Sequence, residues 1–401
     1  MTKKSQQNSI KICMVGFFEY TGDARVRMYT KWLTDHGNFV DVVCKHAFSK
    51  QKIVNEDGAR IFNILKRVNK TSKIRYLFTY GISFLKLCFH VTKLYFQEKY
   101  DFIHFHNIPD FLVFSGSLPK IFGARLILDI HDPMPEVYIS KFSEKVSDLT
   151  LRLICFEEKI SCAFSDGVIT ANHHFKNNLV KRGIQPEKIT IINNYPDPEI
   201  FKREPANESE PNDNQKFTLI FPGTIAPRYG LDIAIKAIPY MISRIQNLCL
   251  RIIGPLGECS DSLINLAKQL EVEEHVEFLS SVPNFIIPKF LQKADIGIYP
   301  ALPGPHMSIA VPGKILEFAA MGLPIVSTRL KIVEEIFGDS ALLFFEPGNY
   351  KEFAHHIINI HDDPLLRKNL SERAGRILEE KFSHDQERSK YFSLIERLMS
   401  I

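Results

Sequence analysis

One stretch, residues 294–328, constrains the fold more than any other part of the chain; it reads ADIGIYPALPGPHMSIAVPGKILEFAAMGLPIVST. Its apolar run 296–299 has the length of a buried strand, and a loop rich in Pro and Gly follows. A helix begins at Lys314 and stops at Gly322, and the apolar run 324–328 predicts the next strand. The loop and the helix start are therefore expected at the carboxyl end of a parallel sheet, where open α/β sheets bind ligands.

The start of that helix carries a pattern that suits a phosphorylated ligand with hydroxyl groups. Lys314 and Glu317 are three residues apart in its first turn, so they share a face. The N-terminus of a helix also favours anions. The simpler alternative is a surface ion pair between the two side chains, worth about 0.2–0.5 kcal/mol.

The chain opens with a strand, a helix and a second strand, at residues 11–16, 24–36 and 39–44. This βαβ order predicts a nucleotide-type fold. The loop after the first strand contains Gly16 and Gly22 but no GxGxxG motif, which argues against a dinucleotide-dependent dehydrogenase. The two glycines either serve turns or leave room for a ligand.

Two predicted strands of the first half, YDFIHFHN and ARLILDI, end in polar side chains. Because carboxyl ends of parallel strands meet at one edge of a sheet, we expect His106 and Asn107 to lie near His131 and Asp132. An imidazole donates to or accepts from a hydroxyl near neutral pH, so His131 is the functional candidate. His104 shares a strand face with His106, and we expect it to be structural.

Residues 60–97 contain basic and aromatic side chains and no acidic one. A basic amphipathic helix in this region predicts contact with an anionic membrane surface. The alternative is a helix that covers the sheet and lays its lysine stems over apolar surface. A nucleic-acid partner is not expected, because the net charge is only +4 and no nucleic-acid-binding motif appears.

Length and cysteine usage limit the class of protein. With 401 residues, 45% of them hydrophobic, the chain is long enough for two domains. Its seven cysteines are scattered and have no zinc-site spacing, which indicates reduced core thiols in a cytosolic protein and no metal site. We find no stretch typical of a signal peptide or a membrane span.

The strand and helix order predicts an α/β fold of two Rossmann-like, doubly wound domains facing across a cleft. The expected bounds are 1–203 for the first domain, 204–216 for a polar linker containing prolines, and 217–382 for the second domain. In the second domain a helix is expected at 231–247, after the first strand and its loop. A final helix is expected at 383–401.

The sequence resembles a known family at several points in a fixed order. FPGTIAPRYGLDIAIKAI, ADIGIYP, VPGKILEFAAMGLPIVST and FFEPGN together resemble retaining nucleotide-sugar glycosyltransferases of the GT-B fold, glycosyltransferase family 4. DFIHFHNIPDFLVFSG and ILDIHDPMPEVY resemble a bacterial surface-polysaccharide branch of that family. The resemblance covers nearly the whole chain and implies that the last helix crosses back to the first domain.

The resemblance implies a donor site on the second domain. Arg228 and Lys314 would hold the diphosphate of a nucleoside diphosphate sugar, beside Gly223 and Thr224. Glu317 matches the second Glu of the EX7E pattern, which contacts the ribose hydroxyls. Pre-placed cations and a helix N-terminus stabilise the charge that a departing diphosphate gains.

The resemblance also implies roles in the first domain. His131 matches a histidine near the reacting sugar and the acceptor, so the catalytic candidates are His131, Arg228 and Lys314. Gly16 would approach the donor phosphates. The acceptor-side candidates are His106, Asn107 and Asp132.

Two positions depart from the family pattern. The first Glu of the EX7E pattern is replaced by Ile309, and no acidic residue lies in 300–316. The sugar hydroxyls would then be held by backbone groups of 308–313, by other side chains, or not at all. The common Arg and Lys of the loop after the first strand of the second domain are Thr224 and Tyr229, and Arg228 is the expected substitute.

The predicted function is that of a hexosyltransferase-type enzyme, independent of metal and cofactor. It would move a sugar from a nucleotide sugar to a lipid-linked or glycan acceptor in cell-surface polysaccharide biosynthesis, as a peripheral protein at the cytoplasmic membrane face. One alternative is a nucleotide-sugar epimerase of the same fold. Another, motivated by Ile309, is a catalytically silent partner protein.

Overall fold

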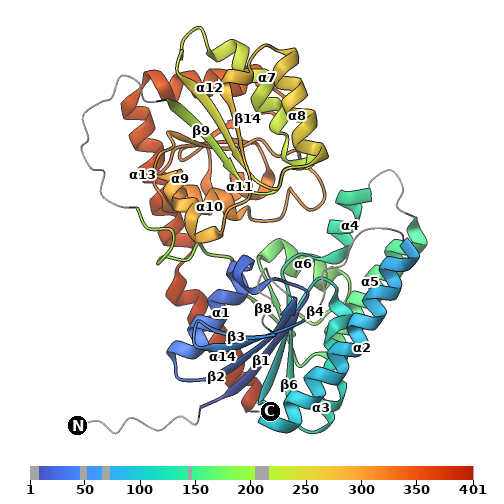
Figure 1. Ribbon diagram of the computed structural model, residues 1–401. Helices are drawn as coiled ribbons and strands as arrows, with labels where there is room; N and C mark the ends of the chain where they lie inside the picture. Colours follow the sequence, from blue (N-terminus) through green and yellow to red (C-terminus); the bar gives the residue numbers. More distant parts are fainter. Residues whose placement is uncertain (1–8, 46–51, 66–72, 143–146, 204–215, 401) are drawn as a thin grey trace, which may run out of the picture. The chain divides into compact units, whose positions relative to one another are not determined.

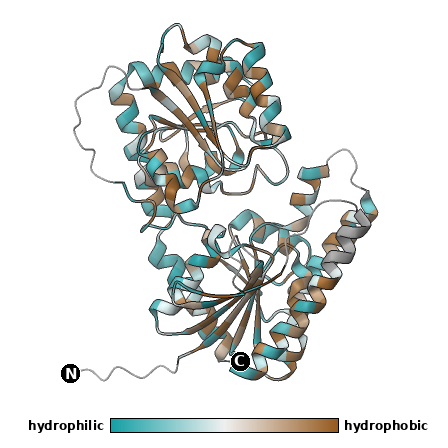
Figure 2. Ribbon diagram, viewed as in Figure 1, coloured by the Kyte–Doolittle hydropathy of each residue, from teal (hydrophilic) through white to brown (hydrophobic). Residues whose placement is uncertain are grey.

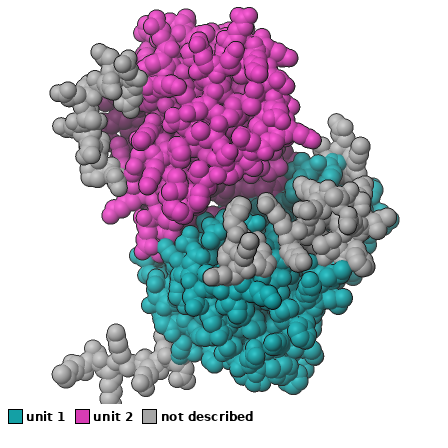
Figure 3. Space-filling view, viewed as in Figure 1, with its two compact units in different colours: residues 1–193, 385–401 teal, residues 194–384 magenta. Residues whose placement is uncertain are grey.

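The computed structural model describes residues 9–45, 52–65, 73–142, 147–203 and 216–400 (Figure 1). They form two compact units, 1–193 with 385–401 and 194–384 (Figure 3). The first unit ends at Asn193, ahead of the bound expected at 203, because the following segment packs through Phe201 into the core of the second unit. The predicted linker, except Lys216, lies outside the described residues.

The first unit is built on an eight-stranded sheet in the order β3-β4-β2-β1-β5-β6-β7-β8. All neighbours are parallel except β3 and β4, which are antiparallel. The βαβ opening is confirmed. The strands are β1 Lys11–Gly16, β2 Phe39–Lys45, β3 Ile53–Glu56, β4 Ala59–Leu65, β5 Phe102–His106, β6 Arg125–Ile130, β7 Gly167–Thr170 and β8 Ile189–Ile191.

Alternation along the strands gives this sheet two different faces. Cys13 and Val15 of β1 face a core shared with α2, α5 and α6, whereas Ile12 and Met14 face a core shared with α1 and α14. His104 of β5 lies on the α1 and α14 face, where its ring contacts Tyr29 and Tyr391. The helices are α1 Ala24–Asp35, α2 Lys73–Glu98, α3 Ser117–Ile121, α4 Met134–Phe142, α5 Asp148–Phe164, α6 His173–Lys181 and α14 His384–Met399.

The C-terminal helix α14 belongs to the first unit. Its Tyr391, Leu394 and Leu398 are buried in the core that α1 also covers. A Cβ at Gly167 would lie 3.1 Å from Leu398 and 3.3 Å from Leu394, so the glycine lets the helix lie close to β7.

The second unit has a six-stranded, fully parallel sheet in the order β11-β10-β9-β12-β13-β14. Its strands carry the apolar residues of one continuous core, and Figure 2 shows them as predominantly hydrophobic. The strands are β9 Phe217–Pro222, β10 Leu248–Ile253, β11 Val276–Leu279, β12 Ile296–Tyr299, β13 Ile325–Thr328 and β14 Leu343–Phe345. The helices are α7 Leu231–Met241, α8 Glu258–Gln269, α9 Ile287–Leu291, α10 Gly313–Ala320, α11 Lys331–Phe337, α12 Tyr350–Asp362 and α13 Pro364–Lys381.

Two local expectations need correction. The helix expected to run to Asn247 ends at Met241, because the chain then turns to start β10 at Leu248. Arg60, which falls in the basic region expected to face a membrane, lies instead on β4. It donates to Asp41 and Glu98 at 2.7 Å, so its charge is neutralised within the fold.

Within the part of the chain that the structure describes, we find no helix with the length and apolar character needed to span a membrane.

Candidate active site

The first cluster lies in the second unit, where the chain order of the sheet reverses. Strand β9 has β10 on one side and β12 on the other, so the loops after β9 and β12 leave the sheet at a topological switch point. The loop after β9 contains the short 3-10 helix Pro227–Tyr229, and the loop after β12 ends at α10. The expected strand, loop, helix and strand of 294–328 are confirmed.

Gly223 allows the side chain of Lys314 to lie against the loop after β9. The glycine has a φ of 132°, and a Cβ there would lie 2.3 Å from Cε and 2.7 Å from Nζ of Lys314. The ammonium is 5.3 Å from the ring centroid of Phe221 and 4.8 Å from that of Tyr229. Both are cation–π distances, so two aromatic rings fix the position of this charge.

Arg228 brings a second cation to the same aromatic ring. Its Cζ is 4.9 Å from the centroid of Tyr229, and its backbone carbonyl accepts a 2.9 Å hydrogen bond from the N–H of Leu302. At Gly230, which has a φ of 59°, a Cβ would lie 2.1 Å from the carbonyl oxygen of Pro300. The glycine therefore lets the two loops approach, and Tyr229 contacts two positive groups. Thr224 is an exposed neighbour in this loop.

Glu317 lies one turn into α10 and is partly buried. Burial raises the pKa of its carboxyl to about 7, although the charge of Lys314 acts in the opposite direction. The alternative of a surface ion pair between Lys314 and Glu317 is not supported, because no such pair forms among the described residues. The side chains of Lys314, Arg228 and Glu317 likewise have no other ion-pair or hydrogen-bond partner in this described set.

The backbone around Ile309 is mostly engaged within its own loop. The N–H groups of 308–310 donate to the carbonyls of Gly304 and His306, and the carbonyl of Ser308 accepts from Ile332. The N–H groups of 308–310 are therefore not available to the donor sugar. The N–H groups of 311 and of the first residues of α10 make no such bond within the loop.

The second cluster lies in the first unit, at the carboxyl ends of β5 and β6. Asn107 joins the two ends: its Oδ1 accepts from the N–H of His131 at 2.9 Å, and its Nδ2 donates to the carbonyl of Asp132 at 2.8 Å. The predicted meeting of His106 and Asn107 with His131 and Asp132 is confirmed by these contacts and by the ring contact of the two histidines. For Gly16 the structure shows a packing role, since a Cβ there would lie 2.6 Å from the ring of Phe18.

His131 contacts a buried network through its Nε2. This nitrogen is 3.0 Å from Nδ1 of His106 and 3.3 Å from Oδ2 of Asp129. Burial acts to lower the pKa of His131, but the charge of Asp129 and its hydrogen bond outweigh that effect and raise the pKa above its usual value. Solvent does not reach Asp129, which is fully buried and held by two hydrogen bonds from Arg25, at 2.9 and 3.0 Å.

The neighbouring histidines are neutral. Burial lowers the pKa of His104 to about 3, and burial together with the charges of His104 and His131 lowers that of His106 well below its usual value. Burial acts to raise the pKa of Asp129, but Arg25 and His131 hold it well below its usual range. The network therefore consists of one anion, one guanidinium and two neutral rings beside His131.

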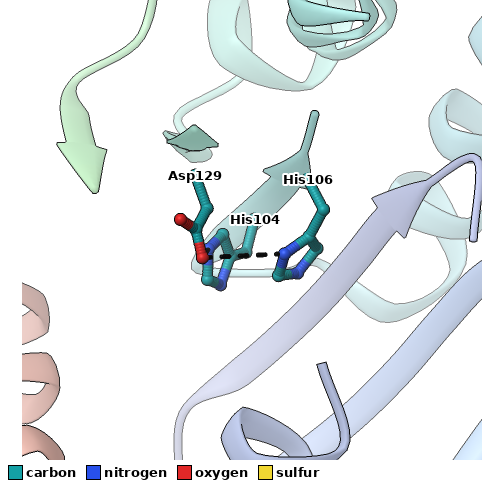
Figure 4. Close-up of side chains that lie close together, drawn as sticks. All are labelled: His104, His106 and Asp129. Carbon is teal, nitrogen blue, oxygen red and sulfur yellow. Dashed lines mark ion pairs between the residues drawn. The ribbon is translucent and has the colours of Figure 1, made fainter. Parts of the chain in front are cut away.

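Figure 4 shows His104, His106 and Asp129 close together, with donor atoms that all lie within 4.8 Å of one another. Two imidazoles and a carboxylate are common ligands of transition metals. Both oxygens of Asp129 already accept from Arg25, however, so a cation bound here would lie beside a buried guanidinium of the same charge. The donor set fits a hydrogen-bonding network better than a metal centre.

Sequence reasoning missed Arg25 and Asp129. The signal for Asp129 was a carboxylate in an otherwise apolar strand, Leu126 to Ile130, because a buried charge requires a partner. The signal for Arg25 was weaker: it lies four residues before the buried Tyr29 on α1, on the face that packs against the sheet.

Each half of the chain matches a glycosyltransferase family model. Residues 24–200 match the model described as Glycosyltransferase Family 4, and residues 202–376 match Glycosyl transferases group 1. The chain has a GT-B glycosyltransferase fold of the group 1 and family 4 type. The expectation of a two-domain α/β fold with parallel sheets is thereby confirmed.

Solved GT-B structures agree with this fold over nearly the whole chain. Sucrose-phosphate synthase from Thermosynechococcus elongatus is 14% identical, with a TM-score of 0.75 over 98% of this chain and 99% of that one. Anabaena HepE, solved in complex with UDP-glucose, is 17% identical, with a TM-score of 0.71 over 98% of this chain and 100% of that one. At these identities the likeness shows the fold alone.

The chain also resembles a component of the human phosphatidylinositol N-acetylglucosaminyltransferase. The two are 21% identical over 345 residues, which are 84% of this chain and 66% of the relative. The chain thus spans just under two thirds of the length of this relative.

Proposed function

We propose that the chain is a retaining glycosyltransferase that moves a hexose from a nucleoside diphosphate sugar to a lipid-linked or glycan acceptor in cell-surface polysaccharide biosynthesis. One observation carries the proposal. Lys314, Arg228 and Glu317 gather at the switch point of the second sheet, and within the described residues their charged groups have no protein partner. Two cations held at one aromatic ring repel each other until an anion binds between them.

The site chemistry follows from these charges. The acceptor oxygen forms a bond to the anomeric carbon, while the bond from that carbon to the phosphate oxygen breaks and leaves its electron pair on the diphosphate. The proton of the acceptor hydroxyl passes to this departing phosphate oxygen. Lys314, Arg228 and the N–H groups that open α10 stabilise the negative charge that develops there. Glu317 accepts from the ribose hydroxyls, for which its carboxylate has free lone pairs. His131 acts at the sugar or the acceptor hydroxyl, beside His106, Asn107 and Asp132, and Gly16 lies at the donor phosphates.

The site residues indicate a diphosphate and a ribose but do not define the base or the sugar of the donor. HepE has been solved with UDP-glucose, which supports uridine diphosphate sugars as the first candidates. Since Ile309 replaces a carboxylate and the N–H groups of 308–310 are used within the loop, the sugar hydroxyls would be held by the remaining backbone groups of 308–313, by other side chains, or not at all.

A transfer and donor-hydrolysis assay with a panel of UDP- and GDP-sugars tests the proposal. We expect one donor to react and Lys314→Ala to lower kcat/KM about 10²- to 10³-fold, as for loss of one preorganised donor group. Lys268→Ala is the matched control, because Lys268 is an exposed lysine on α8 of the same unit. Equal activity of the wild type and Lys314→Ala would reject this site.

The same assay separates the two alternatives. A nucleotide-sugar epimerase would convert the donor sugar without any acceptor, and product analysis would detect the new epimer. A catalytically silent partner protein, suggested by Ile309, would transfer no sugar and bind no nucleotide in calorimetry.

We also propose peripheral contact with an anionic membrane at the cytoplasmic face, through the described part of 60–97. On α2, Lys86 and Lys93 are exposed. Large apolar side chains beside them are exposed too, and α2 and α3 border an open groove of about 770 Å³. Lysine heads and apolar side chains on one face suit the boundary between lipid headgroups and acyl chains. The exposed apolar residues are Leu85, Phe89 and Phe96 of α2 and Leu118, Ile121 and Phe122 of α3 and its end.

Flotation with anionic liposomes at low and high salt tests this contact. We expect binding at low salt and weaker binding at high salt, because surface charges are screened. Phe89→Ser should weaken flotation, whereas Phe285→Ser, at a similarly exposed phenylalanine of the second unit, should not. Absence of flotation under both conditions would reject the proposal.

A further inference from the structure

A buried network of charged and aromatic side chains lies behind His131, and the proposed function gives it no role. Asp129 is the centre of this network: its Oδ2 is 2.9 Å from Nε of Arg25, 3.3 Å from Nε2 of His131 and 3.8 Å from Nε2 of His104. Its other oxygen, Oδ1, is 3.0 Å from a terminal nitrogen of Arg25. The carboxylate is fully buried, so water does not compete with Arg25 and the histidines for its oxygens.

Arg25 fixes the carboxylate in one orientation. Its guanidinium binds both oxygens of Asp129, in the fork geometry that defines both position and rotation of a carboxylate. The remaining terminal nitrogen donates to the carbonyl of Ile192 at 2.8 Å, which anchors the arginine to the end of β8. The face of Asp129 that His131 meets is therefore determined by α1 and β8 and not by His131 itself.

The two ring nitrogens of His131 have different surroundings. Nε2 faces Asp129 and His106. Nδ1 is not among the buried polar atoms that lack a partner, and the side chain is 18% exposed. Since an ionised carboxylate accepts hydrogen bonds and cannot donate them, Asp129 favours the tautomer that carries a proton on the nitrogen facing it.

We propose that Asp129, held by Arg25, is a positioning residue that keeps the proton of neutral His131 on Nε2 and leaves Nδ1 as the nitrogen that meets substrate. Neutral His131 then accepts a hydrogen bond from a hydroxyl at Nδ1, and protonated His131 donates one from the same atom. This assignment rests on the proposed function for the role of Nδ1. The tautomer itself depends only on the buried network.

Other charged and titratable groups near His131 do not supply this effect. His106 Nδ1 lies 3.0 Å from Nε2 of His131, and it accepts from that nitrogen in the Nε2–H form of His131 and would donate to it in the Nδ1–H form. His104 donates or accepts at Tyr391 of α14, at 3.1 Å, and does not reach His131. The groups that face the network are Asp129 from β6, His104 and His106 from β5, Asp23, Arg25 and Tyr29 from α1 and its start, and Tyr391 from α14.

Histidine NMR on the full chain, with ¹⁵N shifts of the imidazole nitrogens, tests the tautomer directly. We expect wild-type His131 to show the Nε2–H form. In Asp129→Asn we expect a mixture of tautomers and a lower pKa of His131, because the negative charge is gone. Asp41→Asn is the matched control, since Asp41 is also fully buried and bound twice by an arginine, Arg60, but contacts no histidine among the residues that the structure describes.

Kinetics provide the second readout. Asp129→Asn should lower kcat/KM at least about 10-fold, and by up to about 10⁴-fold, the loss seen when an orienting carboxylate is removed and the imidazole takes the wrong tautomer. The pH dependence of kcat/KM should shift to lower pH in Asp129→Asn, together with the pKa of His131. Asp41→Asn should leave this pH dependence unchanged. If Asp129→Asn fails to fold, the double variant Arg25→Met with Asp129→Leu removes the carboxylate without leaving a buried charge, and the NMR comparison uses that variant, with the same expected mixture of tautomers.

The outcomes distinguish this proposal from the proposed function. An Nδ1–H tautomer in the wild type, or an unchanged tautomer and pKa in both network variants, would overturn the proposal whether or not the protein transfers sugar. If no nucleotide sugar reacts, the proposed function fails, and the NMR result still decides the role of Asp129.

Discussion

The candidate site clusters of the two units hold their charged side chains in opposite ways. In the first unit, Asp129 is fully buried and has Arg25 and His131 as partners. In the second unit, Lys314 and Arg228 share an aromatic ring, and in the described residues neither has an anionic partner. A charge that is paired inside the fold orients a neighbouring side chain. A charge that is held in place but left unpaired is available to a ligand, at some cost in stability.

The largest difference is expected when one arginine is removed from each unit. Arg25→Met should lower the free energy of unfolding by about 3–5 kcal/mol, because it leaves Asp129 as an uncompensated buried charge. Arg228→Met should change it by no more than about 0.5 kcal/mol, because no ion pair is lost. Urea unfolding of the two variants measures both values.

A double variant tests whether the unpaired carboxylate of Asp129 causes the loss of stability. Arg25→Met with Asp129→Leu should recover part of the stability that Arg25→Met loses, because the unpaired carboxylate is gone. Equal stability losses in Arg25→Met and Arg228→Met would show that the two units do not differ in this way.

The next effect is a pH dependence that comes from the first unit. Buried His104 stays neutral down to a pKa of about 3, whereas the unfolded chain binds a proton at its usual value of 6.5. Stability is therefore fully present above pH 6.5 and falls as the pH drops toward 3, by up to about 1.4 kcal/mol per pH unit for each such histidine. His104→Asn should make the free energy of unfolding less dependent on pH, by the contribution of one protonation. Unfolding curves at pH 7, 6 and 5 would measure this change. A slope equal to that of the wild type would contradict a neutral His104.

A smaller effect of opposite sign is expected from Glu317 in the second unit. Its carboxyl titrates at about 7 in the folded chain and at its usual 4.5 in the unfolded chain, so the folded state binds more protons between these values. Stability then falls as the pH rises from 4.5 to 7. Glu317→Gln should raise Tm at pH 8 by about 6–12 °C, because a difference of about 2.5 between the two pKa values, at about 1.4 kcal/mol per unit, amounts to about 3 kcal/mol, and 1 kcal/mol shifts Tm by about 2–4 °C in a domain of this size. It should leave Tm nearly unchanged at pH 4.5, and a lower Tm at pH 8 would mean that the carboxylate has a stabilising partner.

The sequence predicted the local elements of the site well. The strand at 11–16, the helix that starts at Lys314 and the meeting of His106 with His131 follow from hydrophobic periodicity and from the rule that parallel strands end at one edge. These features depend on neighbours in the chain or on general sheet geometry.

The remaining features depend on contacts between distant residues. Arg25 and Asp129 are 104 positions apart, and Arg60 meets Asp41 and Glu98 across 19 and 38 positions. No local pattern tells which buried charge finds which partner. The hairpin of β3 and β4 did leave a local signal, the Asp57-Gly58 turn with φ values of 51° and 75°, which the basic composition of the region obscured.

We propose that the unpaired charges of the second unit form a site for a nucleoside diphosphate. Calorimetric titration of UDP and GDP into the wild type, Lys314→Ala and the control Lys268→Ala tests it most directly. We predict that one nucleotide binds the wild type and Lys268→Ala with the same Kd, and that Lys314→Ala weakens this binding at least about tenfold, the effect of losing about 1.4 kcal/mol. Equal binding by all three proteins, or binding of neither nucleotide, would contradict it.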